Sequence, residues 1–199
     1  MTSVSAITYA GAMGRWQPGA ADRLRAAALE LFEEQGYEQA TVAGIAERAG
    51  VTERTFYRYF ADKREVLFAG SERLEQSLVA GIAAAPAESD AAALVDAALA
   101  ALAANFTPQQ QAFSRRRSAV LDANPALRER ELLKLASLKA ATIGAFTDRG
   151  TDEGRSVLAA EVTLSVFHIA FTRWITDAQQ REFADLQREA LAELRSVLG

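Results

Sequence analysis

Arginine and tyrosine side chains recur in a short stretch of the first third of the chain. Arg54 and Arg58 are four residues apart, so on a helix they share one face. Bidentate bonding of arginine to guanine is the commonest specific base contact. The hydroxyls of Tyr57 and Tyr59 suit the phosphate oxygens of a duplex. These residue types point to contact with DNA.

Helix-turn-helix spacing surrounds these side chains. Thr41 and Thr52 are favourable N-cap residues, so we expect short helices over residues 42–49 and 53–60. Gly50 lies in the turn between them, where a positive φ is often required. Docking of such a unit places the start of its second helix in the major groove. The side chains expected to pack the two helices together are Ile45, Ala46, Val51 and Phe56.

Positive charge is local in this chain. The formal net charge is -4, which argues against a general nucleic-acid coat protein. Between residues 52 and 64, however, basic residues outnumber acidic ones, and Lys63 and Arg64 can reach the DNA backbone. The candidate DNA-binding residues are Thr41, Thr52, Arg54, Thr55, Tyr57, Arg58, Tyr59 and Lys63.

Several short motifs follow one another between Arg23 and Phe68. They read Thr-x-x-x-Ile-Ala, Gly-Val-Thr and Thr-Phe-Tyr-x-Tyr-Phe, followed by Asp-Lys. This stretch closely resembles the DNA-binding domain of the tetracycline-repressor (TetR) family of bacterial transcriptional regulators. The beginning MGRW and the segment ERTFYRYFADK are similar to an actinobacterial subgroup. Arg54 stands where many members have glycine, which bears on the operator sequence and not on the fold.

The resemblance implies properties that the residues alone do not. It implies a transcriptional regulator that binds a double-stranded DNA operator, acts as a repressor, and is released by a small-molecule effector. It also implies a second, ligand-binding domain of several helices and a homodimer formed by the last two. In such families the DNA contacts fall on the same candidate positions, apart from Arg58.

The composition restricts catalytic chemistry. The chain has no cysteine and a single histidine, His168. This excludes cysteine nucleophiles, thiolate metal sites and a multi-histidine metal site. We therefore expect no enzyme activity, no metal and no cofactor. Two alternatives stay open: a helical-bundle enzyme with converging acids, and an architectural DNA-binding protein that takes no effector.

Abundant alanine, scarce proline and apolar residues at helical spacing predict an all-α fold. We expect a flexible tail over residues 1–17, a three-helix helix-turn-helix domain over 18–65, and a helical effector-binding and dimerisation domain over 66–199. About nine helices are expected in all. They are Ala20–Gln35, Val42–Ala49, Glu53–Phe60, Asp62–Ala85, Asp90–Asn105, Thr107–Asp122, Asn124–Arg149, Asp152–Thr176 and Asp177–Leu198.

The last two expected helices carry more apolar residues than packing of a single face against the rest of the chain requires. The helix over 152–176 has apolar residues on three faces, which indicates burial on most sides. Two such helices from each of two chains would form a four-helix bundle. We therefore expect a homodimer through residues 152–198, with a monomer core that absorbs these faces as the alternative.

One helix face of the second domain mixes arginines with apolar residues. Arg116 and Arg117 share it with Phe113. They can hold an anionic effector at a pocket edge, or form an internal ion pair with Glu131, or extend to solvent. The candidate effector-binding residues, for an anionic or apolar compound, are Phe106, Phe113, Arg116, Arg117, Phe146, Phe167, His168 and Trp174.

Location is indicated by what the sequence lacks. No stretch offers about 20 uninterrupted apolar residues for a membrane span. Residues Met1–Gly14 carry no Lys or Arg, whereas a signal peptide begins with a positively charged region. We expect a cytoplasmic protein without membrane contact.

Overall fold

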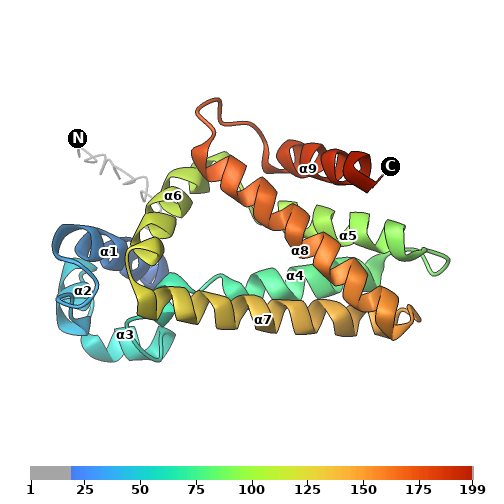
Figure 1. The fold of residues 1–199 in the computed structure, drawn as a ribbon. Coiled ribbons are helices and arrows are strands. Elements are labelled where there is room, and N and C mark those ends of the chain that lie inside the picture. Colours follow the sequence, from blue (N-terminus) through green and yellow to red (C-terminus); the bar gives the residue numbers. More distant parts are fainter. Residues whose placement is uncertain (1–18, 199) are drawn as a thin grey trace, which may run out of the picture.

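The structure is a computed structural model that describes residues 19–198. Within these residues the chain is helical, with no strand, and ten helical elements follow one another (Figure 1). The expected tail, residues 1–17, lies outside the described residues. The elements are α1 (Ala20–Gln35), α2 (Val42–Arg48), α3 (Glu53–Tyr59), the 3-10 turn η1 (Glu65–Leu67), α4 (Ser71–Ala84), α5 (Ala91–Ala103), α6 (Pro108–Asp122), α7 (Pro125–Asp148), α8 (Glu153–Thr176) and α9 (Phe183–Leu198).

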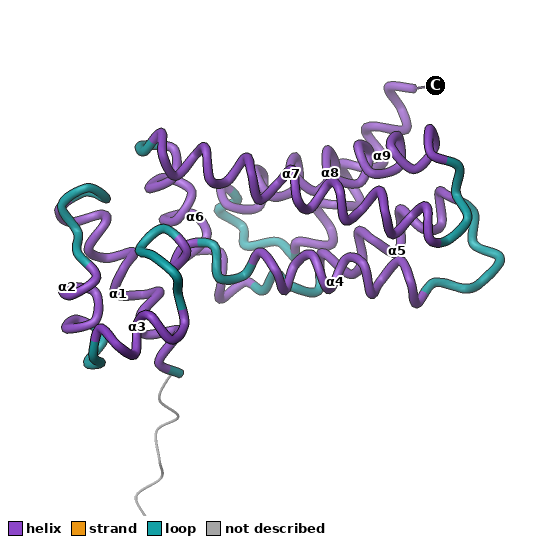
Figure 2. The backbone as a smooth tube through the Cα atoms, turned by 90° about the horizontal axis from the view of Figure 1, so that it is seen from below, coloured by secondary structure: helices purple, strands orange, loops and turns teal. Residues whose placement is uncertain are grey.

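The molecule has two parts with separate apolar cores. Helices α1, α2 and α3 lie together at one end, and α4, α5, α7, α8 and α9 form the larger part (Figures 1 and 2). The first core contains Leu24, Ala28, Ile45 and Phe56, each buried. It also contains residues from the end of α6 and the start of α7. The all-α, two-part prediction is therefore confirmed, and the two parts share a packed junction.

The predicted helix Asp62–Ala85 is wrong as a single element. The carboxylate of Asp62 accepts hydrogen bonds from the backbone N–H of Arg64 at 2.8 Å and of Glu65 at 3.1 Å, so it orders the turn that leads into the short helix η1. The chain then bends, because Val66, Leu67 and Phe68 are buried in the first core. A straight helix would not turn all three inward. The first core thus extends past residue 65, where the domain boundary was expected.

The predicted start of the last helix at Asp177 is also wrong. Helix α9 begins at Phe183, and residues 177–182 form a loop. The Asp177 carboxylate accepts from the backbone N–H of Arg181 at 2.8 Å, so it orders this loop instead of a helix. Gln180 has a φ of 54°, which a right-handed helix does not allow.

Helix α8 is long and apolar enough to cross a membrane by length and composition alone. In this fold it packs against α5, α7 and α9. Val166, Ala170 and Trp174 are buried in the second core, which is the environment of a core helix. Its apolar character is therefore explained in part by packing within the chain.

Candidate nucleic-acid interface

Helices α2 and α3 are held at a fixed angle by a short turn and a shared core. Gly50 adopts a φ of 66° in the turn, and the Val51 N–H donates to the Ala46 carbonyl at 2.9 Å. Ile45 and Phe56 are completely buried between these helices and α1. The packing expected for a helix-turn-helix unit is confirmed.

Both helix starts are capped by threonines, as expected. The Thr41 hydroxyl accepts from the Gly44 N–H at 3.1 Å, and the Thr52 hydroxyl accepts from the Thr55 N–H at 3.2 Å. The hydroxyl oxygens of Thr52 and Thr55 also lie 3.0 Å apart. Each cap uses the oxygen as an acceptor. Thr41 and Thr52 are exposed at the helix N-termini, where phosphates bind readily, and the Thr41 hydroxyl proton has no acceptor among the described residues.

The outer face of α3 is exposed and carries the arginines. Arg54 is exposed and makes no hydrogen bond or ion pair with any described residue. The Arg58 guanidinium lies 4.9 Å from the centre of the Tyr59 ring and donates to its hydroxyl at 3.2 Å, which orients both groups. Tyr57 is 56% exposed. The buried Phe56 therefore directs four candidate contact residues outward.

Lys63 has a different place from the one expected. Its ammonium donates to the carbonyls of Tyr37 at 2.8 Å, Glu38 at 3.2 Å and Ala40 at 3.1 Å. An ammonium has three donor hydrogens, so all of them are used. The structure therefore gives Lys63 the role of holding the loop before α2, and a phosphate contact would require breaking one of these bonds.

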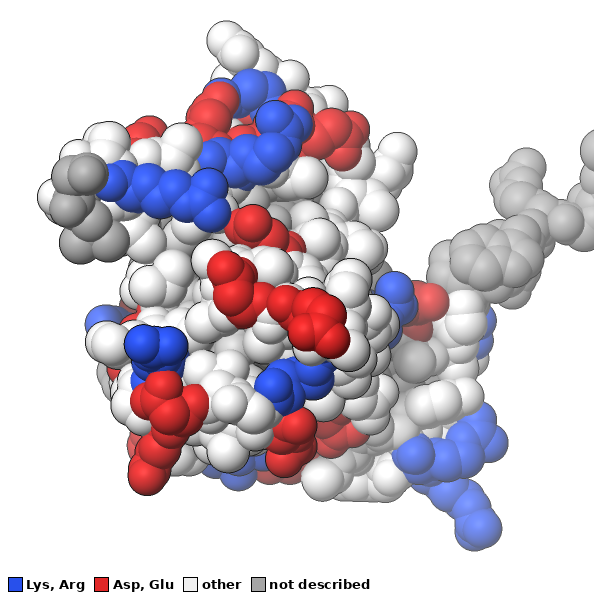
Figure 3. Space-filling model, turned by 90° about the vertical axis from the view of Figure 1, so that its right-hand side faces the viewer, with Lys and Arg blue, Asp and Glu red and all other residues white. Residues whose placement is uncertain are grey.

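Other basic groups nearby are neutralised within the chain. Arg48 donates to Glu34 at 2.6 Å, and this hydrogen bond lowers the pKa of the Glu34 carboxyl. Arg64 pairs with Asp62 at 2.8 Å. At the opposite end of the molecule Lys and Arg are interspersed with Asp and Glu (Figure 3). The outer face of α3 thus keeps its arginine charge free to meet a polyanion, whereas these neighbouring basic groups are paired within the chain.

The eight candidate effector-binding residues lie in three different surroundings: the second core, the surface of α8 and the junction of the two parts. The Phe106 ring stacks on the Phe183 ring, with 4.3 Å between the ring centres. Its centre lies 5.4 Å from that of Trp174 and 5.6 Å from that of Phe167, so these rings fill the space between their helices. Phe146 is completely buried in the same core, whereas His168 is exposed on α8. Four of the candidate side chains are therefore packed in the second core, and His168 lies outside it.

The remaining three candidates lie at the junction of the two parts. Phe113 packs against the first core, beneath the Arg25 guanidinium at 5.0 Å. Arg116 donates to Glu33 of α1 at 2.9 Å. Arg117 donates to the Leu67 carbonyl at 2.7 Å and to Glu131 at 3.3 Å. The expected internal ion pair with Glu131 is therefore present for Arg117, while Arg116 reaches a different partner.

Helix α6 also contacts the far end of the second part. Arg115 donates to the Ile175 carbonyl near the end of α8. The buried Gln111 amide donates to the carbonyls of Trp174 at 2.5 Å and Asp177 at 3.0 Å. Successive helix residues point about 100° apart. Adjacent arginines of α6 can therefore bind different elements, and α6 lies between the end of α8 and helix α1 (Figure 1).

A second set of junction charges escaped prediction. Glu65 pairs with Arg130 at 2.6 Å and with Lys134 at 3.2 Å, both on α7. Burial raises the pKa of the Glu65 carboxyl, but the hydrogen bonds and charges of these two cations outweigh it and lower that pKa. No local spacing signals such pairs, because the partners are 65 residues or more apart.

Metal ligation has no structural basis in the part of the chain that the structure describes. No group of three or more His, Asp or Glu side chains converges there. The second part instead offers apolar hollows beside α9.

Comparisons with known proteins cover both parts of the chain. Residues 24–69 match the family model "Bacterial regulatory proteins, tetR family", and residues 89–199 match the model "MftR C-terminal domain". The HTH-type transcriptional regulator TcmR of Streptomyces glaucescens is 44% identical over 66 residues, which are 33% of this chain and 29% of that protein. The fatty acid metabolism regulator protein of Bacillus subtilis is 46% identical over 41 residues, 21% of each chain. The chain thus spans less than a third of the length of these curated relatives.

Solved structures share the fold over most of the chain. A regulator from Syntrophomonas wolfei has a TM-score of 0.60 at 17% identity, covering 90% of this chain and 95% of that one. The SmeT–triclosan complex has a TM-score of 0.57 at 17% identity, covering 89% and 90%. Thermus thermophilus FadR with lauroyl-CoA has a TM-score of 0.50 at 19% identity, covering 88% and 93%.

Proposed function

Because the chain belongs to the TetR family of bacterial transcriptional regulators, we propose that it binds operator DNA through the outer face of α3. The observation that carries this proposal is the exposed, unpaired Arg54 at the start of a threonine-capped helix. Arg54 reads a base edge in the major groove, and Arg58 lies one turn further along the same face. Tyr57, Tyr59 and the capping threonines bind phosphates.

The test is selection of DNA fragments from a random library by the purified full chain, followed by binding at one fixed salt concentration. Arg54→Ala should cost about 1–3 kcal/mol on the selected site and relax preference at one base pair. Tyr57→Phe should weaken all sequences alike. Arg128→Ala, on the exposed surface of α7 and outside residues 152–198, is the matched control. Unchanged affinity of both α3 variants would refute the assignment.

We also propose a homodimer through residues 152–198. It is supported by apolar side chains of α8 that face outward: Leu158 is 66% exposed, and Val157 and Ile169 are exposed as well. Dimerisation sets two copies of α3 about 34 Å apart, one turn of the duplex. Sedimentation at micromolar concentration should show a dimer, and Leu158→Lys should shift it toward monomer. A monomeric parent chain would contradict this arrangement.

The proposed output is repression relieved by a small-molecule effector in the cytoplasm, without catalysis or a cofactor. Regulators of this fold occur in complex with lauroyl-CoA and with triclosan, so the fold accommodates ligands with large apolar parts. In this chain the signal would pass through α6, because its polar side chains bind both the end of α8 and the first part. A tilt of α6 would move Glu33 and η1, and with them α3.

Effector release is tested by adding candidate compounds to the protein–operator complex. A compound that lowers operator affinity should do so in the parent chain and fail in an Arg116→Met variant, whose own operator affinity is retained. Equal release in both would exclude the pair of Arg116 and Glu33 from the signal path.

A further inference from the structure

The side chains of α3 form four rows, each made of two residues that are four positions apart. Phe56 and Phe60 form the inner row, and both are buried. Arg54 and Arg58 form the row opposite to it, because successive helix residues point about 100° apart. The other two rows flank the arginines: Glu53 with Tyr57 on one side, and Thr55 with Tyr59 on the other. In a major groove these two flanks face its two walls.

The two flanks differ in their hydrogen bonds. On one flank the hydroxyls of Thr55 and Tyr59 are each hydrogen-bonded to a neighbouring side chain, at 3.0 and 3.2 Å. On the other flank Glu53 and Tyr57 are both exposed. Neither the Glu53 carboxylate nor the Tyr57 hydroxyl has a hydrogen bond or ion pair with a described residue. The flank of Glu53 and Tyr57 therefore keeps its polar groups for a partner outside the chain.

The negative charge of Glu53 is unusual on a helix that faces DNA. Phosphates repel a carboxylate and offer it no hydrogen, so a contact with the DNA backbone cannot compensate it. Asp62, the next acidic residue along the chain, is paired with Arg64 at 2.8 Å. Glu53 has no such pair among the described residues. When α3 docks on DNA, a donor for this carboxylate has to come from the base edges.

The base edges offer a carboxylate two kinds of donor in the major groove. These are the N4 amino group of cytosine and the N6 amino group of adenine. Adenine also presents the acceptor N7 beside its amino group, and a carboxylate, which only accepts, is repelled there. Cytosine presents its amino group without such an acceptor on the same base. A carboxylate in this place therefore favours cytosine.

Glu53 also lies at the end of α3 that enters the groove. In helix-turn-helix docking the first residues of the second helix contact base edges. Glu53 directly precedes Arg54, and consecutive Cα atoms are about 3.8 Å apart, close to the rise of roughly 3.4 Å between base pairs. The two side chains therefore address bases within about one step of each other.

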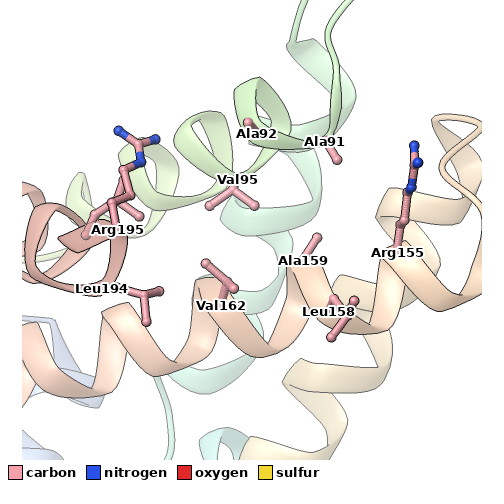
Figure 4. Close-up of a pocket in the computed structure, with 10 residues that line it drawn as sticks. Ala91, Ala92, Val95, Arg155, Leu158, Ala159, Val162, Leu194 and Arg195 are labelled. Carbon is pink, nitrogen blue, oxygen red and sulfur yellow. The ribbon is translucent and has the colours of Figure 1, made fainter. Parts of the chain in front are cut away.

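Charged groups around the apolar hollow of the second part are paired instead. This hollow has a volume of about 300 Å³ and lies between α5 and α8 (Figure 4). Arg155 at one end pairs with Asp152 at 3.3 Å, and Arg195 at the other end pairs with Asp96 at 3.5 Å. These charges are compensated within the chain and indicate no ligand, unlike the unpaired carboxylate of α3.

We propose that Glu53 is a specificity-determining residue, whose carboxylate accepts a hydrogen bond from the N4 amino group of a cytosine within one base pair of the guanine read by Arg54. This inference rests on the proposed DNA binding through α3 and adds a second base to the recognised site. Glu53 lowers the affinity for sequences that offer it no amino group, because its charge then faces phosphates and acceptors without compensation.

The test is selection of DNA fragments by the full parent chain and by its variants, followed by affinities measured at one salt concentration. For the parent, replacement of the C·G pair by T·A should lower the affinity about tenfold, a typical cost of one wrong base pair. Glu53→Ala should bind these two sequences alike, and should bind unrelated DNA more tightly than the parent does. Glu53→Gln should prefer adenine at that position, because glutamine bonds to both N6 and N7 of adenine.

Glu47→Ala is the matched control. Glu47 lies on α2, is exposed, and its carboxylate also has no partner among the described residues. Its removal should leave the base preference at every position as in the parent.

Two results would overturn this inference. One is an unchanged base preference in Glu53→Ala, or a relaxed preference for a base other than cytosine. The other is an equal fall in affinity for all sequences in both Glu53 variants, which would indicate a structural role. If Arg54→Ala is impaired while Glu53→Ala keeps the parent's preference, this inference fails and the proposed DNA binding stands. A parent chain that selects no sequence would overturn both.

Discussion

Replacement of Gly81 by alanine tests the closest approach between two helices of the second part. A Cβ atom at 81 would lie 2.4 Å from the Ala101 Cβ and 3.2 Å from the Ala97 carbonyl oxygen. Neither neighbour is the end of a flexible side chain, so α4 and α5 must separate by about 1 Å to reach ordinary contact at 3.4 Å. That separation would also strain the hydrogen bond from the Ser77 hydroxyl to the Ala101 carbonyl, now 2.9 Å.

Two opposing contributions set the magnitude. Alanine in place of a helical glycine stabilises by about 0.5–1 kcal/mol, and overpacking in a closely packed interior costs about 1–3 kcal/mol, occasionally more. We expect Gly81→Ala to lower the free energy of unfolding by about 1–2 kcal/mol. For a chain of this size the melting temperature should then fall by roughly 2–8 °C.

Gly144 provides the matched control. It lies within α7, and a Cβ there would meet nothing within 4 Å. Gly144→Ala should therefore show the helix gain alone, about 0.5–1 kcal/mol. The assay is urea unfolding followed by circular dichroism, with thermal unfolding as a second measure. If Gly81→Ala is as stable as Gly144→Ala, α4 and α5 do not approach as closely at residue 81 as this reasoning requires.

Three further predictions concern the junction and the loop before α2. The pKa of Glu65 is lowered from its ordinary value of 4.5, so its pairs with Arg130 and Lys134 stabilise the fold fully at pH values above 4.5. That stabilisation is lost as the pH falls through the lowered pKa. Glu65→Gln should cost about 1–2 kcal/mol at pH 7 and flatten the acid limb of a stability–pH profile; an unchanged limb would exclude this group. Lys63→Met should destabilise the fold by about 1–3 kcal/mol, since three carbonyls lose their donor. It should leave the slope of log affinity against log salt on DNA unchanged, whereas a drop of about 0.9 would indicate a phosphate contact. Arg117→Met leaves Glu131 and the Leu67 carbonyl without a donor. We expect calorimetry to show one unfolding transition for the parent chain and two for the variant; one sharp transition for both would contradict the coupling.

The sequence alone determined the helix-turn-helix unit and its exposed face. The reason is that its interactions are local. The hydroxyls of Thr41 and Thr52 each accept from a backbone N–H three residues ahead, and Gly50 lies in the turn between the two helices. Apolar spacing also placed most helix boundaries within a few residues, because helical periodicity depends on neighbours along the chain.

Tertiary structure decided where helices are interrupted and which polar groups meet. The chain bends after η1 because Val66–Phe68 are drawn into the first core, and no local pattern distinguishes that from a continuing helix. Arg116 and Glu33 are 83 residues apart, so only the fold brings them together. Phe106, Phe167 and Trp174, which were expected to surround an effector, pack on one another. Protein interiors are closely packed, and large rings from neighbouring helices fill the space between them. That the Glu53 carboxylate has no partner among the described residues is likewise visible only once its neighbours are placed, since hydrogen bonding is a property of position and not of residue type.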